Sequence, residues 1–204
     1  MLSKLRFSVA VAACAAMPVF GSAAVAATDN GNFASRGLGA QSCADVISML
    51  ESEEGDLASL QFAAWVGGYI SHANRTTEGI FDVMPIQDVY AVATIVARLC
   101  EQNPDSPVEP AMASLVSMLS PGAQSEPSEI STVEHEGAST AISQNTMQRV
   151  QVRLAELGHL PEGGADGVYG PQTRQALEAF QSENSINQNG IPDPITLFVI
   201  FADM

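Results

Sequence analysis

The strongest constraint on the fold is a seven-residue pattern that occurs twice near the end of the chain. Residues 167–173 read GVYGPQT and residues 190–196 read GIPDPIT. Both copies have glycine, an aliphatic residue, two variable residues, proline, one further residue and threonine, in that order. Proline fixes φ near the helical value and lacks the N–H that a helix start leaves unpaired. Each copy is therefore predicted to lead a loop into a helix.

The other positions of the pattern fit this interpretation. Thr173 and Thr196 fall in the first helical turn, where a hydroxyl can bond back toward the loop. Asp193 is a suitable cap for the second helix. Gly167 and Gly190 stand where the chain must reverse tightly, and positive φ is usual at such positions.

Three helices are predicted in this part of the chain. The first has apolar residues at helical spacing and ends before Gly158, a suitable C-terminal cap; its apolar residues are Met147, Val150, Leu154 and Leu157. The second is predicted from Pro171 to about Ser182, and a short apolar third helix begins at Pro194.

This combination closely resembles the three-helix peptidoglycan-binding domain that is attached to many bacterial cell-wall hydrolases. The residues that carry the resemblance are Val150-Gln151, Leu154, Leu157-Gly158, the run Asp166 to Thr173, Ala176, Phe180-Gln181, Gly190, Asp193 and Thr196. The predicted domain spans residues 146–204. The resemblance implies a non-catalytic module that holds cell-wall glycan or stem peptide in a shallow groove beside the loops.

On this resemblance, Asp166, Tyr169 and Gln172 are the candidate ligand-binding residues, because a flat ring and short polar side chains suit a sugar or a peptide amide. A structural role is the alternative. Asp166 can bond the backbone of its own turn, and Gln151 and Gln181 can be satisfied inside the core. Stem peptides are anionic and this domain is acidic, so binding must rely on shape and hydrogen bonds.

Residues 1–27 are predicted to be a signal peptide. Lys4 and Arg6 precede an apolar run over residues 7–20 that is too short to span a bilayer comfortably, and residues 24–26, Ala-Val-Ala, offer a cleavage site. We therefore expect an exported, periplasmic protein with no membrane span after cleavage. An acylated anchor at Cys14 is the alternative, since Val-Ala-Ala-Cys has the small-residue pattern of a lipoprotein site.

The chain is strongly acidic, with a formal net charge of −15 at pH 7. Signal cleavage would leave six arginines against 23 acidic residues, a formal charge of −17. Nucleic acid and anionic lipid surfaces both require a basic footprint, so neither is an expected partner. Residues 28–41 are expected to be a flexible N-terminus.

Residues 42–119 are predicted to form a helical bundle. Apolar residues at helical spacing predict four helices, namely one that Ser42 caps and one each over residues 56–74, 85–100 and 107–119. Cys43 and Cys100 form an even pair in an exported chain, which is most simply a disulfide. It would stabilise the fold by about 4 kcal/mol on the chain-entropy account. Trp65 and Tyr69, one turn apart, are expected to be core residues.

Three segments of this bundle together resemble small exported helical proteins with one cysteine pair, related to the HdeA acid-stress chaperones and to immunity proteins that block secreted amidases. The segments are Ser42-Cys43-Ala44, the run WVGGYISHAN at residues 65–74, and residues 99–104. The resemblance implies a disulfide-tied helical fold and says little about what that fold binds. A periplasmic protein partner for residues 42–119 is the hypothesis that it motivates.

Residues 120–145 are predicted to be a flexible linker. The stretch PGAQSEPSEISTVEHEGASTAISQN is rich in Ser, Glu, Pro and Gly, and its isolated aliphatic residues have no helical period. The predicted protein is thus all-α: a disulfide-stapled helical bundle that a flexible linker joins to a three-helix peptidoglycan-binding-like domain.

Catalysis is not expected, and neither is a metal or another cofactor. A zinc hydrolase needs three converging ligands, whereas the histidines at 72, 135 and 159 fall in the bundle, the linker and a loop. A cysteine peptidase needs a free thiol, which the predicted disulfide removes. The leading hypothesis is a wall-bound protein that presents the helical bundle to a partner. The alternatives are a periplasmic inhibitor or chaperone, and a small cell-wall hydrolase with two facing carboxylates.

Overall fold

The computed structural model describes residues 33–161 and 163–204. The predicted signal peptide, with Cys14, and residues 28–32 lie outside the described residues. Residues 34–204 form one compact unit, distinct from residues 1–33. Within the described ranges, no helix combines the length and the apolarity that a membrane crossing requires.

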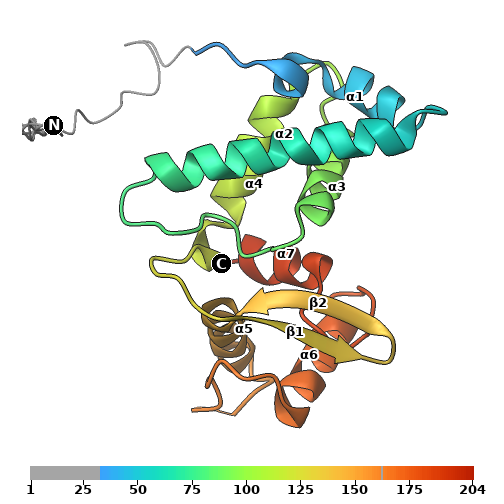
Figure 1. The fold of residues 1–204 in the computed structure, drawn as a ribbon. Helices are drawn as coiled ribbons and strands as arrows, with labels where there is room; N and C mark the ends of the chain where they lie inside the picture. The colour runs from blue at the N-terminus through green and yellow to red at the C-terminus, as the bar shows by residue number, and fades with distance from the viewer. Residues whose placement is uncertain (1–32, 162) are drawn as a thin grey trace, which may run out of the picture. The chain divides into compact units, whose positions relative to one another are not determined.

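Four α-helices make up the N-terminal part of this unit (Figure 1): α1 (Cys43–Leu50), α2 (Gly55–Thr76), α3 (Val89–Cys100) and α4 (Val108–Met118). The hydroxyl of Ser42 accepts a hydrogen bond from the Asp45 N–H, so Ser42 caps α1 as predicted.

The start of α3 differs from the predicted start at Pro85. The Asp88 side chain accepts hydrogen bonds from the N–H groups of Tyr90 and Ala91, and this cap fixes the helix start at Val89. Pro85 lies in the preceding loop, and Ile86 is buried in the core without being helical. Apolar periodicity alone could not separate the buried loop residue from the helix.

The predicted disulfide is present and joins Cys43 at the start of α1 to Cys100 at the end of α3. Trp65 and Tyr69 are partly buried and pack against the core, as expected. The Tyr69 hydroxyl donates to Glu109 Oε1 at 3.1 Å, which ties α2 to α4. Burial, and then the charge of Glu109, raise the pKa of Tyr69 to about 12.

Residues 28–41 are expected to be flexible, but the part of them that the structure describes contains a short helix that contacts α2. Residues 37–40 form a short 3-10 helix, η1 (Gly37–Ala40). The indole N–H of Trp65 donates to the Arg36 carbonyl at 3.1 Å, and a Cβ at Gly39 would collide with the same indole ring. Glycine at position 39 therefore lets this segment lie directly against α2.

The segment expected to be a flexible linker, residues 120–145, instead contains a 3-10 turn, η2 (Ser120–Gly122), and a β-hairpin. Strand β1 (Ile130–His135) pairs antiparallel with β2 (Ala138–Ser143). The two loop residues, Glu136 and Gly137, have φ values of 48° and 82°, as a tight two-residue hairpin loop requires. The protein is therefore mostly helical with one small sheet, and the all-α expectation is corrected.

Three further helices follow the hairpin: α5 (Gln144–Glu156), α6 (Pro171–Glu183) and α7 (Pro194–Ala202). Proline opens α6 and α7, as the repeated pattern predicts. The Asp193 carboxylate accepts from the Thr196 N–H, which confirms the predicted cap of α7. Gly158, with φ of 82°, follows the end of α5.

Contacts also join the two parts of the compact unit. Asp82 and Gln124 form a short antiparallel bridge, and Arg149 of α5 donates to the Pro121 carbonyl at 2.8 Å. Phe201 of α7 is buried close to Gly122. The division of the chain into domains at residues 42–119 and 146–204 stays a prediction.

Candidate functional site

A buried glutamine of α5 holds the first loop of the repeat in place. Gln151 is fully buried, and its Nε2 donates to Asp166 Oδ1, the Val168 carbonyl and Thr173 Oγ1 at 2.9–3.0 Å. Its Oε1 accepts from the Gly167 N–H at 2.7 Å. One amide side chain therefore fixes both the loop and the first turn of α6.

A second glutamine repeats this arrangement in the next loop. Gln181 of α6 is also fully buried, and its Nε2 donates to Asn189 Oδ1, the Ile191 carbonyl and Thr196 Oγ1, each at 2.9 Å. The Gly190 N–H donates to its Oε1 at 2.8 Å. Each heptapeptide, together with the Asp or Asn just before it, thus supplies the same partners, in the same order, to a glutamine on the preceding helix. The structural alternative is confirmed for both glutamines.

The glycine that opens both copies of the pattern follows from this geometry. Gly167 and Gly190 have φ values of 75° and 69°, a conformation that residues with a Cβ rarely adopt. A Cβ at Gly167 would lie 2.9 Å from Cγ of Gln144, and one at Gly190 would lie 2.8 Å from Cγ of Arg174. Both glycines are therefore required by backbone conformation and by space.

Asp166 serves its own turn. Its Oδ1 accepts from the Val168 N–H at 2.9 Å as well as from Gln151. The Val168 N–H and then Gln151 hold the pKa of the Asp166 carboxyl below its ordinary value. Asn189 takes the same place in the second loop and accepts from the Ile191 N–H. An uncharged oxygen is therefore sufficient for the structural part of this role.

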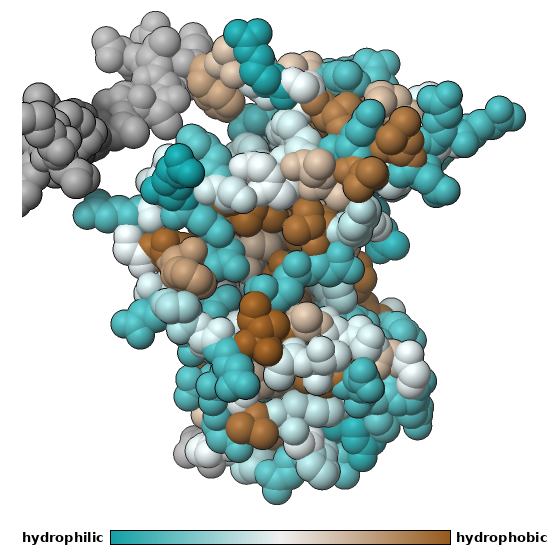
Figure 2. Space-filling view, in the orientation of Figure 1, coloured by the Kyte–Doolittle hydropathy of each residue, from teal (hydrophilic) through white to brown (hydrophobic). Residues whose placement is uncertain are grey.

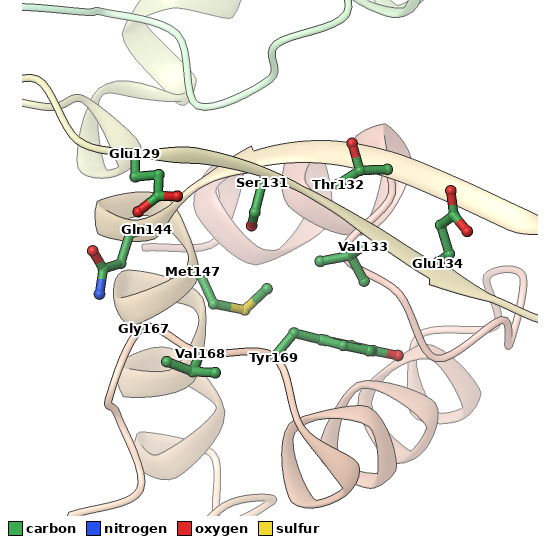
Figure 3. A pocket seen from close by; sticks show the side chains of 10 residues that line it. All are labelled: Glu129, Ser131, Thr132, Val133, Glu134, Gln144, Met147, Gly167, Val168 and Tyr169. Atoms are coloured by element: carbon green, nitrogen blue, oxygen red, sulfur yellow. The ribbon is translucent and has the colours of Figure 1, made fainter.

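A groove of about 470 Å³ lies between β1 and the first loop (Figure 3). One wall is β1, from which Ser131 and Val133 point into the groove, and the other wall is formed by Gly167, Val168 and Tyr169. Met147 of α5 lies between the two walls. The groove therefore combines a segment expected to be a linker with the loop that the repeat builds.

The three candidate ligand-binding residues occupy different places. Tyr169 lines the groove, and its hydroxyl donates its proton to the Gly190 carbonyl at 2.9 Å, which holds the ring in place at the groove wall. Burial raises the pKa of Tyr169. Asp166 is committed to the turn behind the groove wall, and Gln172 is exposed in the first turn of α6 without lining the groove. Their roles in binding stay predictions.

The second loop is packed against α6 at the positions where the first loop lines the groove. Buried Pro192 stands at the position that Tyr169 has in the first copy, and Gly190 packs against Arg174 and Glu178. Arg174 and Glu178 form an ion pair at 2.7 Å. The second copy of the pattern therefore braces the domain, and the first copy faces the groove.

Sequence reasoning missed the β1 wall because its residues are mostly polar. Only Val133 of β1 is buried, so the strand has no apolar period to detect. The available signal was the dipeptide Glu136-Gly137 between two runs of Ser, Thr and aliphatic residues, which is a weak form of the hairpin pattern.

The described residues contain no group of three or more His, Cys, Asp or Glu side chains that could hold a metal ion. His135 lies at the end of the hairpin, 4.0 Å from Glu178 Oε1, and His159 lies 3.1 Å from Glu183 Oε2. These two histidines therefore have carboxylate neighbours on α6 at different points along that helix.

Residues 143–200 match the family model described as a putative peptidoglycan binding domain. The match confirms the resemblance that the repeated heptapeptide carries. It begins at the last residue of β2, so the β1 wall of the groove precedes the matched residues. No curated protein and no solved structure gives a significant match to the chain.

Proposed function

We propose that this chain is a non-catalytic exported protein that binds peptidoglycan through its C-terminal domain and presents residues 42–119 to a protein partner at the cell wall. The observation that carries the proposal is the groove between β1 and the first loop, since that loop lies within the residues that match the putative peptidoglycan-binding family.

The groove is suitable for a piece of a polymer. Its volume of about 470 Å³ falls in the range of ordinary ligand sites. Val133, Met147 and the Tyr169 ring supply apolar contact, while Glu129 and Gln144 supply polar groups at one end. Such a mixed lining can bind a sugar ring or a short peptide without any bound ion.

Sedimentation with purified sacculi tests this proposal. Val168 lines the groove and is 58% exposed, so Val168→Glu adds a carboxylate and bulk there without disturbing the core. Val152 on α5 is 43% exposed and lies outside the groove, which makes Val152→Glu the matched control. We expect the wild-type chain and the control to pellet with sacculi, and the Val168 variant to remain largely in solution.

Equal retention of both variants would move the binding surface away from this groove. Failure of the wild-type chain to pellet would contradict peptidoglycan binding as part of its function. The alternative, in which both parts of the chain bind only proteins, would then be the better account.

Two features support a role without catalysis. Cys43 and Cys100 are joined in a buried disulfide, so neither offers a nucleophilic thiolate. His72 lies exposed on α2, far along the chain from the histidines that contact α6. Incubation of the protein with sacculi should release no soluble fragments. Release that increases with protein concentration would instead show a cell-wall hydrolase.

Export is proposed from the sequence, and both the disulfide and the wall-binding family fit an extracytoplasmic location. Intact mass of the protein recovered from cells tests it. We expect a chain that begins after Ala26 or Ala27. A mass that corresponds to a lipid-modified Cys14 as the first residue would establish the lipoprotein alternative, and an uncleaved chain would contradict export by this route.

A protein partner for residues 42–119 is proposed from exposed apolar side chains. Leu57 and Leu60 on α2, and Tyr90 on α3, are each 53% exposed. Figure 2 shows apolar side chains at the surface over the N-terminal half of α2. Affinity capture with the full chain should recover a stoichiometric protein that Leu60→Glu loses and Val152→Glu retains. Identical capture by both variants would contradict this surface.

A further inference from the structure

One edge of the hairpin carries backbone groups with no partner among the described residues. The Gln144 N–H donates to the Glu129 carbonyl at 2.8 Å, which identifies this cross-strand pair as a hydrogen-bonded one. Such pairs alternate in an antiparallel ladder. With the observed register, Ser131 and Val133 therefore bond to β2, whereas the N–H and C=O groups of Thr132 and Glu134 point away from it.

This free edge borders the groove. Thr132 and Glu134 both line it, and no backbone or side-chain group of the described residues bonds to the outward N–H and C=O groups of these two residues. Figure 3 shows β1 running along the groove opposite the chain at Gly167, Val168 and Tyr169. An extended chain in the groove would therefore lie beside an unpaired strand edge.

Two other hydrogen-bonding groups at or near the groove are already engaged. The Tyr169 hydroxyl donates to Gly190, and the Asp166 carboxylate serves its own turn. Recognition of sugars relies on side-chain donors and acceptors around the ring, whereas a strand edge presents N–H and C=O groups about 7 Å apart, at every second residue. The free edge of β1 therefore matches peptide amides, and the side chains of Ser131 and Gln144, which also line the groove, can add hydrogen bonds to such a chain.

The charge of the groove adds a second restriction. Glu129 and Glu134 line it, and no lysine or arginine of the described residues does. The Glu129 side chain points toward the groove, whereas the Glu134 side chain points away from the loop on the opposite wall (Figure 3). Neither carboxylate takes part in an ion pair within the described ranges. Charged side chains at a strand edge also discourage pairing with a second copy of the chain. A ligand that carries an ammonium group complements the Glu129 carboxylate.

We infer that the groove binds the stem-peptide part of peptidoglycan as an extended chain added to the free edge of β1, with a free amine of the stem beside Glu129. This inference rests on the proposed wall-binding function and names the part of the wall that is bound. It also assigns specificity to residues 129–134, which precede the family match at residues 143–200.

Two proline substitutions at opposite residues of the hairpin test whether the free edge of β1 binds the ligand. Thr132 and Ala141 face each other in the ladder, and both N–H groups point outward, one toward the groove and one toward the outer edge of β2. Thr132→Pro removes the groove-side donor and leaves the β1–β2 bonds intact, and Ala141→Pro is the matched control. Melting temperatures of both variants close to that of the wild type would show that both hairpins form.

The probes are soluble stem peptides released from sacculi, the same peptides after acetylation of their amines, and glycan strands stripped of peptide. By calorimetry, we expect Thr132→Pro to weaken binding of the stem peptide about tenfold, as loss of one hydrogen bond implies, and Ala141→Pro to leave it unchanged. Acetylation of the amine and Glu129→Gln should each weaken it about threefold, whereas Glu126→Gln, outside the groove, should not.

Several results would overturn the inference. One such result is that stripped glycan binds as well as the stem peptide. Another is that Thr132→Pro and Ala141→Pro bind the stem peptide equally well. If intact sacculi still retain the protein in either case, the wall-binding proposal stands and the peptide-edge inference falls. If intact sacculi do not retain the wild-type chain, both fall together. Binding of an unrelated lysine-bearing peptide as tightly as the stem would assign the edge to a protein ligand instead.

Discussion

At the scale of single residues, the C-terminal domain is organised by one side-chain type used twice. Gln151 and Gln181 each accept one glycine N–H and donate to an Asx oxygen, a backbone carbonyl and a threonine hydroxyl. A buried amide with all its partners present is stabilising, whereas its loss leaves several buried groups unpaired. These glutamines are therefore core residues despite their polarity.

Replacement of Gln151 tests this directly. Gln151→Leu should lower the free energy of unfolding by about 2–3 kcal/mol, because the Gly167 N–H and the Thr173 hydroxyl lose their partner. Gln175 is exposed on α6 and forms no side-chain hydrogen bond with the described residues, so Gln175→Leu is the control. Urea unfolding at pH 7 gives both values. Equal stability of the two variants would refute a structural role for Gln151.

Two glycines of the same loop test whether stability depends on the left-handed backbone at one position, or whether any alanine in the loop has the same effect. Gly167 has φ of 75°, whereas Gly170 has an extended backbone and open space where a methyl group would lie. Gly167→Ala should be less stable than Gly170→Ala by about 1–2 kcal/mol, the cost of a left-handed conformation for a residue with a Cβ. Thermal unfolding measures the difference, and the reverse order would contradict the observed loop.

Asp166 gives a prediction for acid stability. Its folded-state pKa is lowered, so its ionised form stabilises the fold above the ordinary aspartate pKa of about 3.9, and this contribution is lost as pH falls through the folded value. Asp166→Asn keeps the oxygen that Asn189 supplies in the second loop. Below about pH 5, the variant should lose less stability than the wild type. Parallel curves in urea unfolding, followed down to about pH 2, would contradict this.

Much of this residue-level account was predictable from the sequence. Proline, glycine and threonine in a repeated order predicted two loop-to-helix entries, and both occur. The pattern did not reveal which copy would face a groove. Tyr169 and Pro192 occupy the same position, but Tyr169 lines the groove with residues of β1, whereas Pro192 is buried.

At the scale of elements, the helices were predictable and the hairpin was not. Helices α1, α2, α5 and α6 follow apolar periodicity, because one face of each packs on the core. The hairpin has only Val133 and Ile142 as buried aliphatic residues in its two strands, so its composition is that of a linker. Its order comes from the tight turn and from packing on α5, which a local pattern does not encode.

The disulfide allows a prediction at this scale. Cys43 and Cys100 are 57 positions apart and join the start of α1 to the end of α3. The double variant Cys43→Ala/Cys100→Ala should be less stable by about 4 kcal/mol, mainly because its unfolded chain gains conformational freedom. Urea unfolding of the wild type under reducing conditions should show a comparable loss. An unchanged midpoint in both experiments would show that the four-helix part does not depend on this link.

At the scale of the whole molecule, the proposed site combines two segments, of which only one belongs to the residues that match the peptidoglycan-binding family. The loop at residues 167–169 lies within the family match, whereas the β1 wall lies before it. The acidic character of the chain, −15 overall, excludes a simple electrostatic attraction to an anionic wall. Shape, strand-edge hydrogen bonds and a local carboxylate–amine contact must therefore supply the affinity, and we expect it to be modest.

The central claim is that the groove between β1 and the first loop binds peptidoglycan. Backbone NMR of the chain without the predicted signal peptide, titrated with soluble peptidoglycan fragments, tests this claim most directly. The account predicts that the largest amide shifts occur at Thr132, Glu134 and residues 167–169, with little change in α1 to α4. Shifts confined to α1–α4, or no shifts at millimolar fragment, would contradict it.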